Sequence, residues 1–312
     1  MKNVVVIGGG HGQSTIVRGV KNIKDIDLKA IVTVADDGGS TGRLRELYNI
    51  PAVGDIRNVL LAMSDNEEFF TKLLEYRFEG EGEIDVMGHS LGNLIMVALM
   101  GMNDGSLIEA IKQVGRLLNV KGRVFPASLE ILTLYARNID DTITRGEANI
   151  PKAQNRISKV YYDHDVKADQ DAVDAIMAAD LVIYGIGSLY TSIAPIPIIK
   201  EIGEALDKTK AKRVYFANCM TQQGETYNYD LKDHIDALEK HGAKGDMVVR
   251  HNNTIPQSIL YRYYAEDSIE VVNNGGISVP VIERDLLDFS NNVVRHDPEK
   301  IRTVVEELLE DC

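Results

Sequence analysis

The sequence opens with an apolar run that ends in a cluster of glycines, and this feature constrains the fold most. The apolar run occupies residues 4–7, and an apolar pattern of helical spacing begins at Ser14. Between them lie Gly8, Gly9, Gly10 and Gly12. A strand, a glycine turn and a helix N-terminus in this order let main-chain N–H groups approach a phosphate, and the helix dipole favours the anion. The sequence therefore predicts a nucleotide-binding α/β protein with these four glycines at the ligand.

The glycine turn departs from the full dinucleotide fingerprint G-x-G-x-x-G. Gly8 and Gly10 take the first two places, but Gln13 stands in the third. Because the third glycine normally allows close packing of helix on strand, we expect the helix to start at a different angle. The glycines by themselves leave open that the turn holds no ligand.

The composition limits the partners and the cellular compartment that we expect for this protein. The 312 residues carry a net charge of −13, which disfavours nucleic acid and anionic membranes as partners. A phosphate ligand would therefore need local positive potential. The two cysteines, Cys219 and Cys312, lie far apart without metal-ligand spacing, which indicates a reducing compartment. The N-terminus lacks a signal-peptide pattern and the apolar run at 94–102 is too short to span a bilayer, so we expect a cytoplasmic protein without membrane insertion.

The order of apolar segments predicts the fold class. A second strand at 28–34 makes residues 1–35 a βαβ unit, followed by a helical insertion at about 54–120 and a short β-rich segment at about 124–160. Further strand candidates follow at 180–186, 213–217, 247–249 and 270–272, and a last helix at 298–309. We expect a Rossmann-like, doubly wound α/β fold with a mostly parallel sheet, in a single nucleotide-binding domain of residues 1–312.

Polar clusters follow several of these strands, and the carboxyl ends of parallel strands share one edge of a sheet. The densest cluster spans residues 36–45. Asp36 and Asp37 could hold a divalent metal or a ribose hydroxyl, and Arg43 and Arg45 could pair with phosphate. The other ligand candidates in this cluster are Gly38, Gly39, Ser40 and Thr41. The alternative is a polar turn in which the two acids are solvated caps.

Five other places in the sequence contribute candidate ligand-binding residues. Two open predicted helices: Asp55, Arg57 and Asn58, and His89 and Asn93. A second glycine loop contains Gly187, Ser188, Tyr190, Thr191 and Ser192. The remaining candidates are Asn218, Thr221 and Arg295. Helix capping is the alternative for several of them, with Ser90 and Asp297 as N-caps. A hydrolase is disfavoured because G-x-S-x-G is absent around Ser188.

Taken together, these motifs resemble the bacterial gluconeogenesis factor family, within the 2-phospho-L-lactate transferase-like superfamily. They occur in order as GGGHG at 8–12, DDGGSTGRLR at 36–45, GDIRN at 54–58, GHSLGNL at 88–94, GSLYTS at 187–192 and NCMTQQGET at 218–226. The sequence departs from the family at Ile186, where proline is usual, and at Ile196, where asparagine is usual.

The resemblance implies a UDP-sugar ligand such as UDP-N-acetylglucosamine and a role in cell shape and wall synthesis during growth on gluconeogenic carbon. It also implies a possible metal site at Asp36 and Asp37, with Mg²⁺ as the candidate, because the transferase relatives use acids there with a divalent metal. A homo-oligomer and a regulatory protein partner are expected as well.

Three function classes stay open. The favoured one is a nucleotide-sugar-binding regulator without turnover. The second is a metal-dependent transferase of the 2-phospho-L-lactate type. The third is an NAD-type oxidoreductase, for which Asp36 lies at an acceptable distance after Gly8, although Asp37 and the two arginines suit phosphate and metal better.

Overall fold

The computed structural model describes residues 1–79, 86–153 and 155–311. Its main sheet has seven strands, and every neighbouring pair is parallel. From one edge to the other the strands are β10 (Val281–Arg284), β9 (Met247–His251), β8 (Lys212–Phe216), β7 (Leu181–Tyr184), β1 (Lys2–Gly8), β2 (Ile26–Val32) and β3 (Arg123–Pro126). The predicted mostly parallel, Rossmann-like sheet is confirmed.

The strand order places a topological switch point between β1 and β7. The chain runs from β1 to β2 and β3 on one side, and from β7 to β8, β9 and β10 on the other. Residues 4–7 of β1 are fully buried, as expected for a central strand covered by helices on both faces. Ligands of such sheets bind in the crevice beyond the carboxyl ends of the strands at this point.

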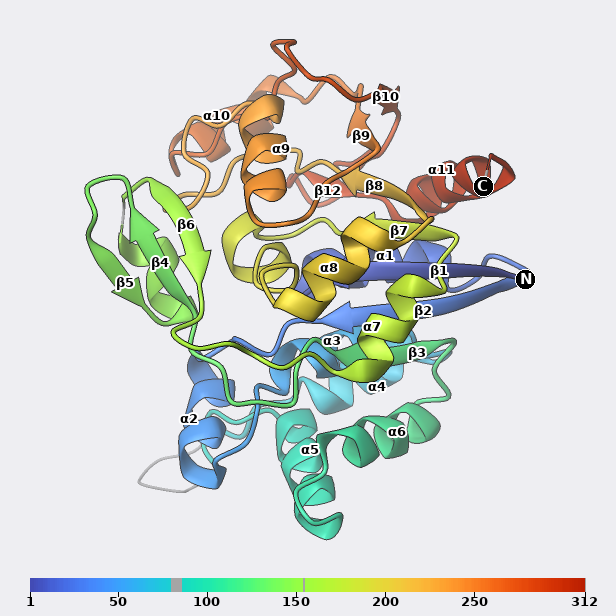
Figure 1. The fold of residues 1–312 in the computed structure, drawn as a ribbon, viewed down its shortest axis with the longest axis vertical. Coiled ribbons are helices and arrows are strands. Elements are labelled where there is room, and N and C mark those ends of the chain that lie inside the picture. Colours follow the sequence, from blue (N-terminus) through green and yellow to red (C-terminus); the bar gives the residue numbers. More distant parts are fainter. Residues whose placement is uncertain (80–85, 154, 312) are drawn as a thin grey trace.

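Helices cover both faces of the sheet. In Figure 1, α7 and α8 lie in front of it, while α1 packs against α3 and α11. The described helices are α1 (Gly10–Val20), α2 (Gly39–Tyr48), α3 (Gly54–Ala62), α4 (Glu67–Leu74), α5 (Leu91–Met102), α6 (Leu107–Leu117), α7 (Gln170–Met177), α8 (Lys200–Lys208), α9 (Leu231–Lys240), α10 (Gln257–Tyr264) and α11 (Pro298–Glu310). None of them is long and apolar enough to cross a membrane.

Local signals explain where several helices begin. The Ser90 and Ser106 hydroxyls accept hydrogen bonds from the Asn93 and Glu109 N–H groups and so cap α5 and α6. Asp297 caps α11, which has Pro298 in its first turn, as predicted. The predicted helical insertion therefore exists between β2 and β3, although it already begins with α2.

A small antiparallel sheet lies beside the main one. Its strands are β5 (Ile143–Arg145), β4 (Tyr135–Asn138) and β6 (Ile157–Tyr161), with the 3₁₀ helix η1 (Glu147–Ala153) between β5 and β6. In Figure 1 it stands at the left, beyond the carboxyl ends of β1 and β2. A further antiparallel pair joins β11 (Leu287–Asp288) to β12 (Arg295–His296). The predicted β-rich segment is thus divided, because β3 belongs to the main sheet.

Two predictions about elements were wrong. The first helix begins at Gly10 instead of Ser14, so the glycine cluster is the first turn of the helix. Residues 270–272 form no strand of the main sheet. The Val271 N–H donates to the Cys219 carbonyl, which holds this run against the loop after β8, and β10 takes the expected place beside β9.

Candidate functional site

Two glycine loops meet main chain to main chain at the switch point. Gly10 has a φ of +56°, and α1 starts there with no side-chain cap. A Cβ added at Gly12 would lie 2.1 Å from the Ile186 carbonyl oxygen, so a side chain has no room where α1 touches the loop after β7. The N–H groups of the first turn of α1 have no partners within the helix, so they can donate hydrogen bonds to an anion.

Gln13 has a specific role in the third place of the fingerprint. Its side-chain amide donates to the carbonyls of Val6 (2.8 Å) and Ile31 (3.0 Å), in β1 and β2. The side chain is fully buried beneath the glycine turn. The close-packing glycine of this turn is therefore Gly12, which contacts the second glycine loop, whereas Gln13 joins α1 to the sheet.

The second glycine loop is held in place by its own polar side chains. Ser188 caps the short π-helix η2 (Leu189–Ile193) by accepting from the Thr191 N–H at 3.1 Å. The Ser188 hydroxyl and the Tyr190 N–H donate to the Glu225 carboxylate. The Asn218 amide donates to the Gly187 carbonyl at 2.8 Å. These hydrogen bonds within the protein stabilise the conformation of the loop, and Ser192 is half-buried beside it.

Ile186 and Ile196, the two positions at which the sequence departs from the family pattern, have different surroundings. Ile186 is half-buried and its carbonyl faces Gly12, while Ile196 is fully buried in the core.

Four carboxylates from distant parts of the sequence gather beside the glycine turn. Asp36 follows β2, Asp55 lies in the first turn of α3, Glu147 begins η1 and Glu225 follows β8. A Cβ added at Gly9 would lie 2.5 Å from an Asp55 carboxylate oxygen, and one at Gly54 would lie 3.1 Å from an Asp36 oxygen.

The pKa values of these acids are raised. Burial, reinforced by the charge of Asp36, raises the pKa of Asp55 to about 7. Burial and the charges of Asp36 and Asp55 raise the pKa of Glu147 to about 8. Burial also raises the pKa values of Asp36 and Glu225. Acidic groups are therefore concentrated here, and the charges of Arg45 and Arg57 offset the effect of burial on Asp36 and Asp55 only in part, which is typical of functional sites.

This arrangement predicts a pH dependence of stability. The unfolded protein loses the protons of Asp55 and Glu147 near pH 4, whereas the folded protein keeps them up to about pH 7 and 8, so its free energy of unfolding falls as pH rises through this interval. Between pH 7 and 9, above the ordinary histidine pKa, we expect the free energy of unfolding from urea denaturation to fall by about 1–2 kcal/mol. Glu147→Gln should flatten the profile and the surface control Glu68→Gln should not; equal profiles for wild type and Glu147→Gln would contradict the environment assigned to Glu147.

Asp37 is bound to the main chain of η1. One carboxylate oxygen accepts from the Ala148 N–H at 2.9 Å, which ties the loop before α2 to η1. Asp36 instead accepts from the Gly38 N–H at 2.9 Å within its own turn, and interacts with the Thr41 hydroxyl. The carboxylate that shares space with Asp36 and the glycine turn is Asp55. No group of three His, Cys, Asp or Glu in the described part of the chain could hold a metal ion by itself.

Two of the candidate arginines, Arg43 and Arg45, donate hydrogen bonds to main-chain carbonyls. Arg45 is 7% exposed and donates to the carbonyls of Ala35, Asp36 and Leu132. Arg43 is exposed and donates to the Met87 carbonyl at 3.0 Å. Arg45 therefore stabilises the loop between β2 and α2.

Arg57 belongs to a buried polar network that joins α2, α3 and α5. It donates to Ser90, Asn58 and, at 2.8 Å, Asn93. The Asn93 amide donates to the Ser40 hydroxyl at 3.1 Å, and the Ser40 oxygen lies 2.9 Å from Nδ1 of His89. Burial and the charges of Arg43 and Arg77 lower the pKa of His89, so its ring is neutral at pH 7.

Two further candidates lie apart from the acid cluster. Thr221 accepts from the Ile269 N–H at 2.9 Å and anchors the 268–271 segment. Arg295 is exposed on β12. Their roles as ligand contacts stay predictions.

Two cavities flank the acid cluster. One of about 600 Å³ lies between the 37–39 loop and η1, and its lining includes Asp37, Gly39, Arg45 and Lys152. The other, of about 340 Å³, is lined by Glu225, Arg156 and Tyr227 among others. Volumes of this size suit small polar ligands. The site thus offers the uncapped N-terminus of α1, clustered acids and two neighbouring cavities.

Comparison with known proteins identifies the family of the chain. The family model described as 2-phospho-L-lactate transferase CofD matches residues 4–287. The chain belongs to this family. It is similar to the gluconeogenesis factor of Bacillus subtilis, with 39% identity over 99% of this chain and 98% of that protein. It is also similar to the gluconeogenesis factor of Listeria monocytogenes, with 40% identity over 98% and 95%.

A solved structure shares the fold. The crystal structure of a Bacillus halodurans protein superimposes with a TM-score of 0.93 at 37% identity, covering 98% of this chain and 99% of that one. The family resemblance seen in the sequence motifs is therefore confirmed, as is the fold class.

Sequence reasoning did not single out Glu147 and Glu225 as site residues. Glu147 lies in the predicted β-rich segment, and Glu225 lies in the motif at 218–226. A signal was available for Glu225, which follows a strand predicted to end at the ligand edge. None was available for Glu147, because its position depends on the small sheet folding over that edge.

Proposed function

We propose that the protein is a nucleotide-sugar-binding regulator that holds the pyrophosphate of a UDP-sugar, of the UDP-N-acetylglucosamine type, at the switch point. The supporting observation is the junction of two glycine loops at the N-terminus of α1, where Gly12 leaves no room for a side chain. Its proposed setting is the cytoplasm, in the control of cell shape and wall synthesis on gluconeogenic carbon. A homo-oligomer and a regulatory protein partner stay predictions.

The electrostatics of the site favour a divalent cation with this ligand. A pyrophosphate carries about two negative charges, and it would lie beside Asp36 and Asp55 while Arg45 and Arg57 are engaged elsewhere. Two carboxylates near a hydroxyl suit Mg²⁺, which is commonly bound by one or two acids together with substrate phosphates. We therefore place the metal between Asp36 and Asp55, with Thr41 nearby, instead of at Asp36 and Asp37. When bound, Mg²⁺ would neutralise the phosphate charge.

Calorimetry tests the ligand and the metal together. We expect UDP-N-acetylglucosamine to bind in the presence of Mg²⁺ and to bind at least about tenfold more weakly in EDTA, since each 1.4 kcal/mol is tenfold in affinity. GDP, NAD and a deazaflavin serve as comparison ligands. Preferential binding of NAD would favour an oxidoreductase and overturn the proposal.

The family match favours one second candidate, a metal-dependent transferase of the 2-phospho-L-lactate type. As a regulator, the protein should bind without turnover. We expect no steady product release when it is incubated with Mg²⁺ and either a UDP-sugar or a guanylylated phospholactyl donor plus a deazaflavin, followed by chromatography. Sustained product formation that disappears in Asp55→Asn would establish the transferase instead.

A further inference from the structure

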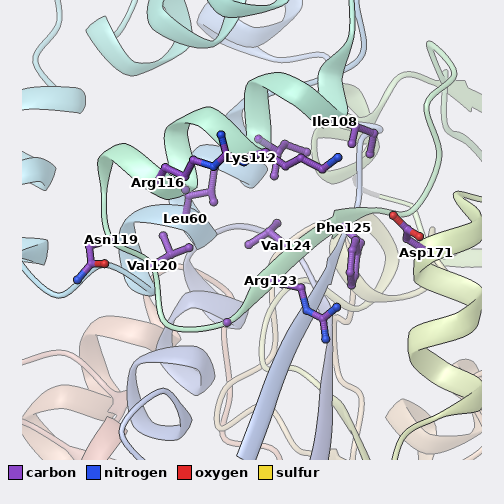
Figure 2. Close-up of a pocket in the computed structure, with 13 residues that line it drawn as sticks. Leu60, Ile108, Lys112, Arg116, Asn119, Val120, Arg123, Val124, Phe125 and Asp171 are labelled. Carbon is purple, nitrogen blue, oxygen red and sulfur yellow. The ribbon is translucent and has the colours of Figure 1, made fainter.

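A second cavity lies away from the ligand edge, between α6, α3 and the edge strand β3. It has a volume of about 370 Å³. Figure 2 shows Val120 and Val124 pointing from the β3 side toward α6, with Ile108 at the far end and Leu60 behind. The walls are thus aliphatic, and Phe125 adds an aromatic ring beside Arg123. None of these residues contributes to the site described above.

The charges around this cavity are arranged unevenly. Lys112 forms an ion pair with Glu109 at 2.9 Å, and Arg123 forms one with Asp27 at 2.5 Å. Within the described part of the chain, the Arg116 guanidinium has no hydrogen-bond or ion-pair partner. Asp171 lies at the opposite end of the cavity in Figure 2, near the first turn of α7.

These observations define the ligand by its chemistry. An aliphatic or aromatic body would remove the half-buried side chains of Ile108, Val120 and Phe125 from water, which is favourable in proportion to the area buried. One anionic group would pair with Arg116, the cation that lacks a partner. A second anionic group at the other end would be repelled by Asp171. The chain carries a net charge of −13, but the rim of this cavity contains the cations Lys112, Arg116 and Arg123. The local potential therefore favours an anion where the overall charge does not.

We propose that this cavity is a binding site for a small amphipathic monoanion, a molecule with an apolar body and a single carboxylate, sulfonate or phosphate ester group. The anionic group lies at the Arg116 end and the apolar body lies between α6 and β3. The volume is near the lower end of the range for small-molecule pockets, so the ligand is compact. The site is independent of the nucleotide site proposed above.

The probe for the test is 8-anilinonaphthalene-1-sulfonate, which has an aromatic body, one sulfonate and a fluorescence that rises in apolar surroundings. We expect saturable binding with one site per chain, about tenfold weaker in Arg116→Glu because the charge pair becomes a repulsion. Lys208→Glu on α8 is the matched control, since it reverses an exposed helix cation outside the cavity, and it should bind as the wild type does.

A second variant fills the cavity without changing its charge. Ile108 is half-buried in the first turn of α6, and Ile108→Trp should abolish the saturable site while circular dichroism shows an unchanged fold. If Ile108→Trp fails to fold, the probe affinity of Arg116→Glu still tests the proposal. Equal probe affinity in the wild type and Arg116→Glu, or binding without saturation, would overturn the proposal.

Discussion

Replacing Gly12 with alanine is expected to destabilise the protein by about 2–3 kcal/mol and to weaken UDP-sugar binding at least about tenfold, as overpacking at a main-chain contact does. The added Cβ would lie 2.1 Å from the Ile186 carbonyl oxygen and 2.6 Å from the Gly187 Cα. Neither atom belongs to a flexible side chain, so the two glycine loops must separate. The N–H groups of α1 would then move relative to the second loop. Urea denaturation and calorimetry measure the two effects.

Gly101→Ala provides the matched control for this substitution. Gly101 also lies inside a helix, but no atom lies within 4 Å of the added Cβ. Alanine has the higher helix propensity, so this variant should gain up to about 1 kcal/mol in stability and keep its ligand affinity. If Gly12→Ala behaved like Gly101→Ala, the two loops would not be in the contact that defines the proposed site.

Replacing Asp55 with asparagine is expected to remove the Mg²⁺ dependence of ligand binding and to weaken binding in Mg²⁺ about a hundredfold, the upper end of what loss of one metal-supporting group costs. Asp36→Asn should act in the same direction. The same change at Asp55 should make the ligand-free protein more stable at pH 8, because a buried carboxylate with a pKa of about 7 must otherwise ionise beside Asp36. Gain of stability together with loss of metal-dependent binding distinguishes a functional acid from a structural one.

Asp37→Asn is the control, because Asp37 follows Asp36 in the sequence but bonds the Ala148 N–H. It should retain the Mg²⁺ dependence of ligand binding. If Asp37→Asn lost this dependence while Asp55→Asn kept it, the metal would belong to the pair expected from the sequence, and the spatial assignment would be wrong.

The sequence predicted the features that depend on local patterns. Fully apolar runs marked β1 and β7 as buried strands, and Asp297 with Pro298 marked the start of α11. The glycine cluster was predicted to lie at the ligand-binding edge of the sheet, because a strand, a glycine turn and a helix in this order place the turn beyond the carboxyl end of the strand. The start of α1 at Gly10 was not predicted. Gln13 interrupts the glycine fingerprint in the sequence, but in the structure its buried side chain bonds the main chain of the sheet.

The features that were missed depend on contacts between distant residues. The proximity of Asp36 to Asp55 depends on α3 packing against the loop after β2, which local sequence patterns do not show. The engagement of Arg45 with three carbonyls depends on its burial, which a polar motif does not reveal. The run at 270–272 has the composition of a strand, yet it pairs with the loop after β8.

The central claim is that a divalent metal and a nucleotide pyrophosphate meet between Asp36 and Asp55 at the junction of the glycine loops. Crystals grown with Mn²⁺ and UDP-N-acetylglucosamine test it most directly, through the anomalous signal of manganese. We expect one strong manganese peak beside the Asp36 and Asp55 carboxylates, with the pyrophosphate at the first turn of α1. A bound nucleotide at the switch point without a manganese peak there, or a peak at Asp37 instead, would contradict it.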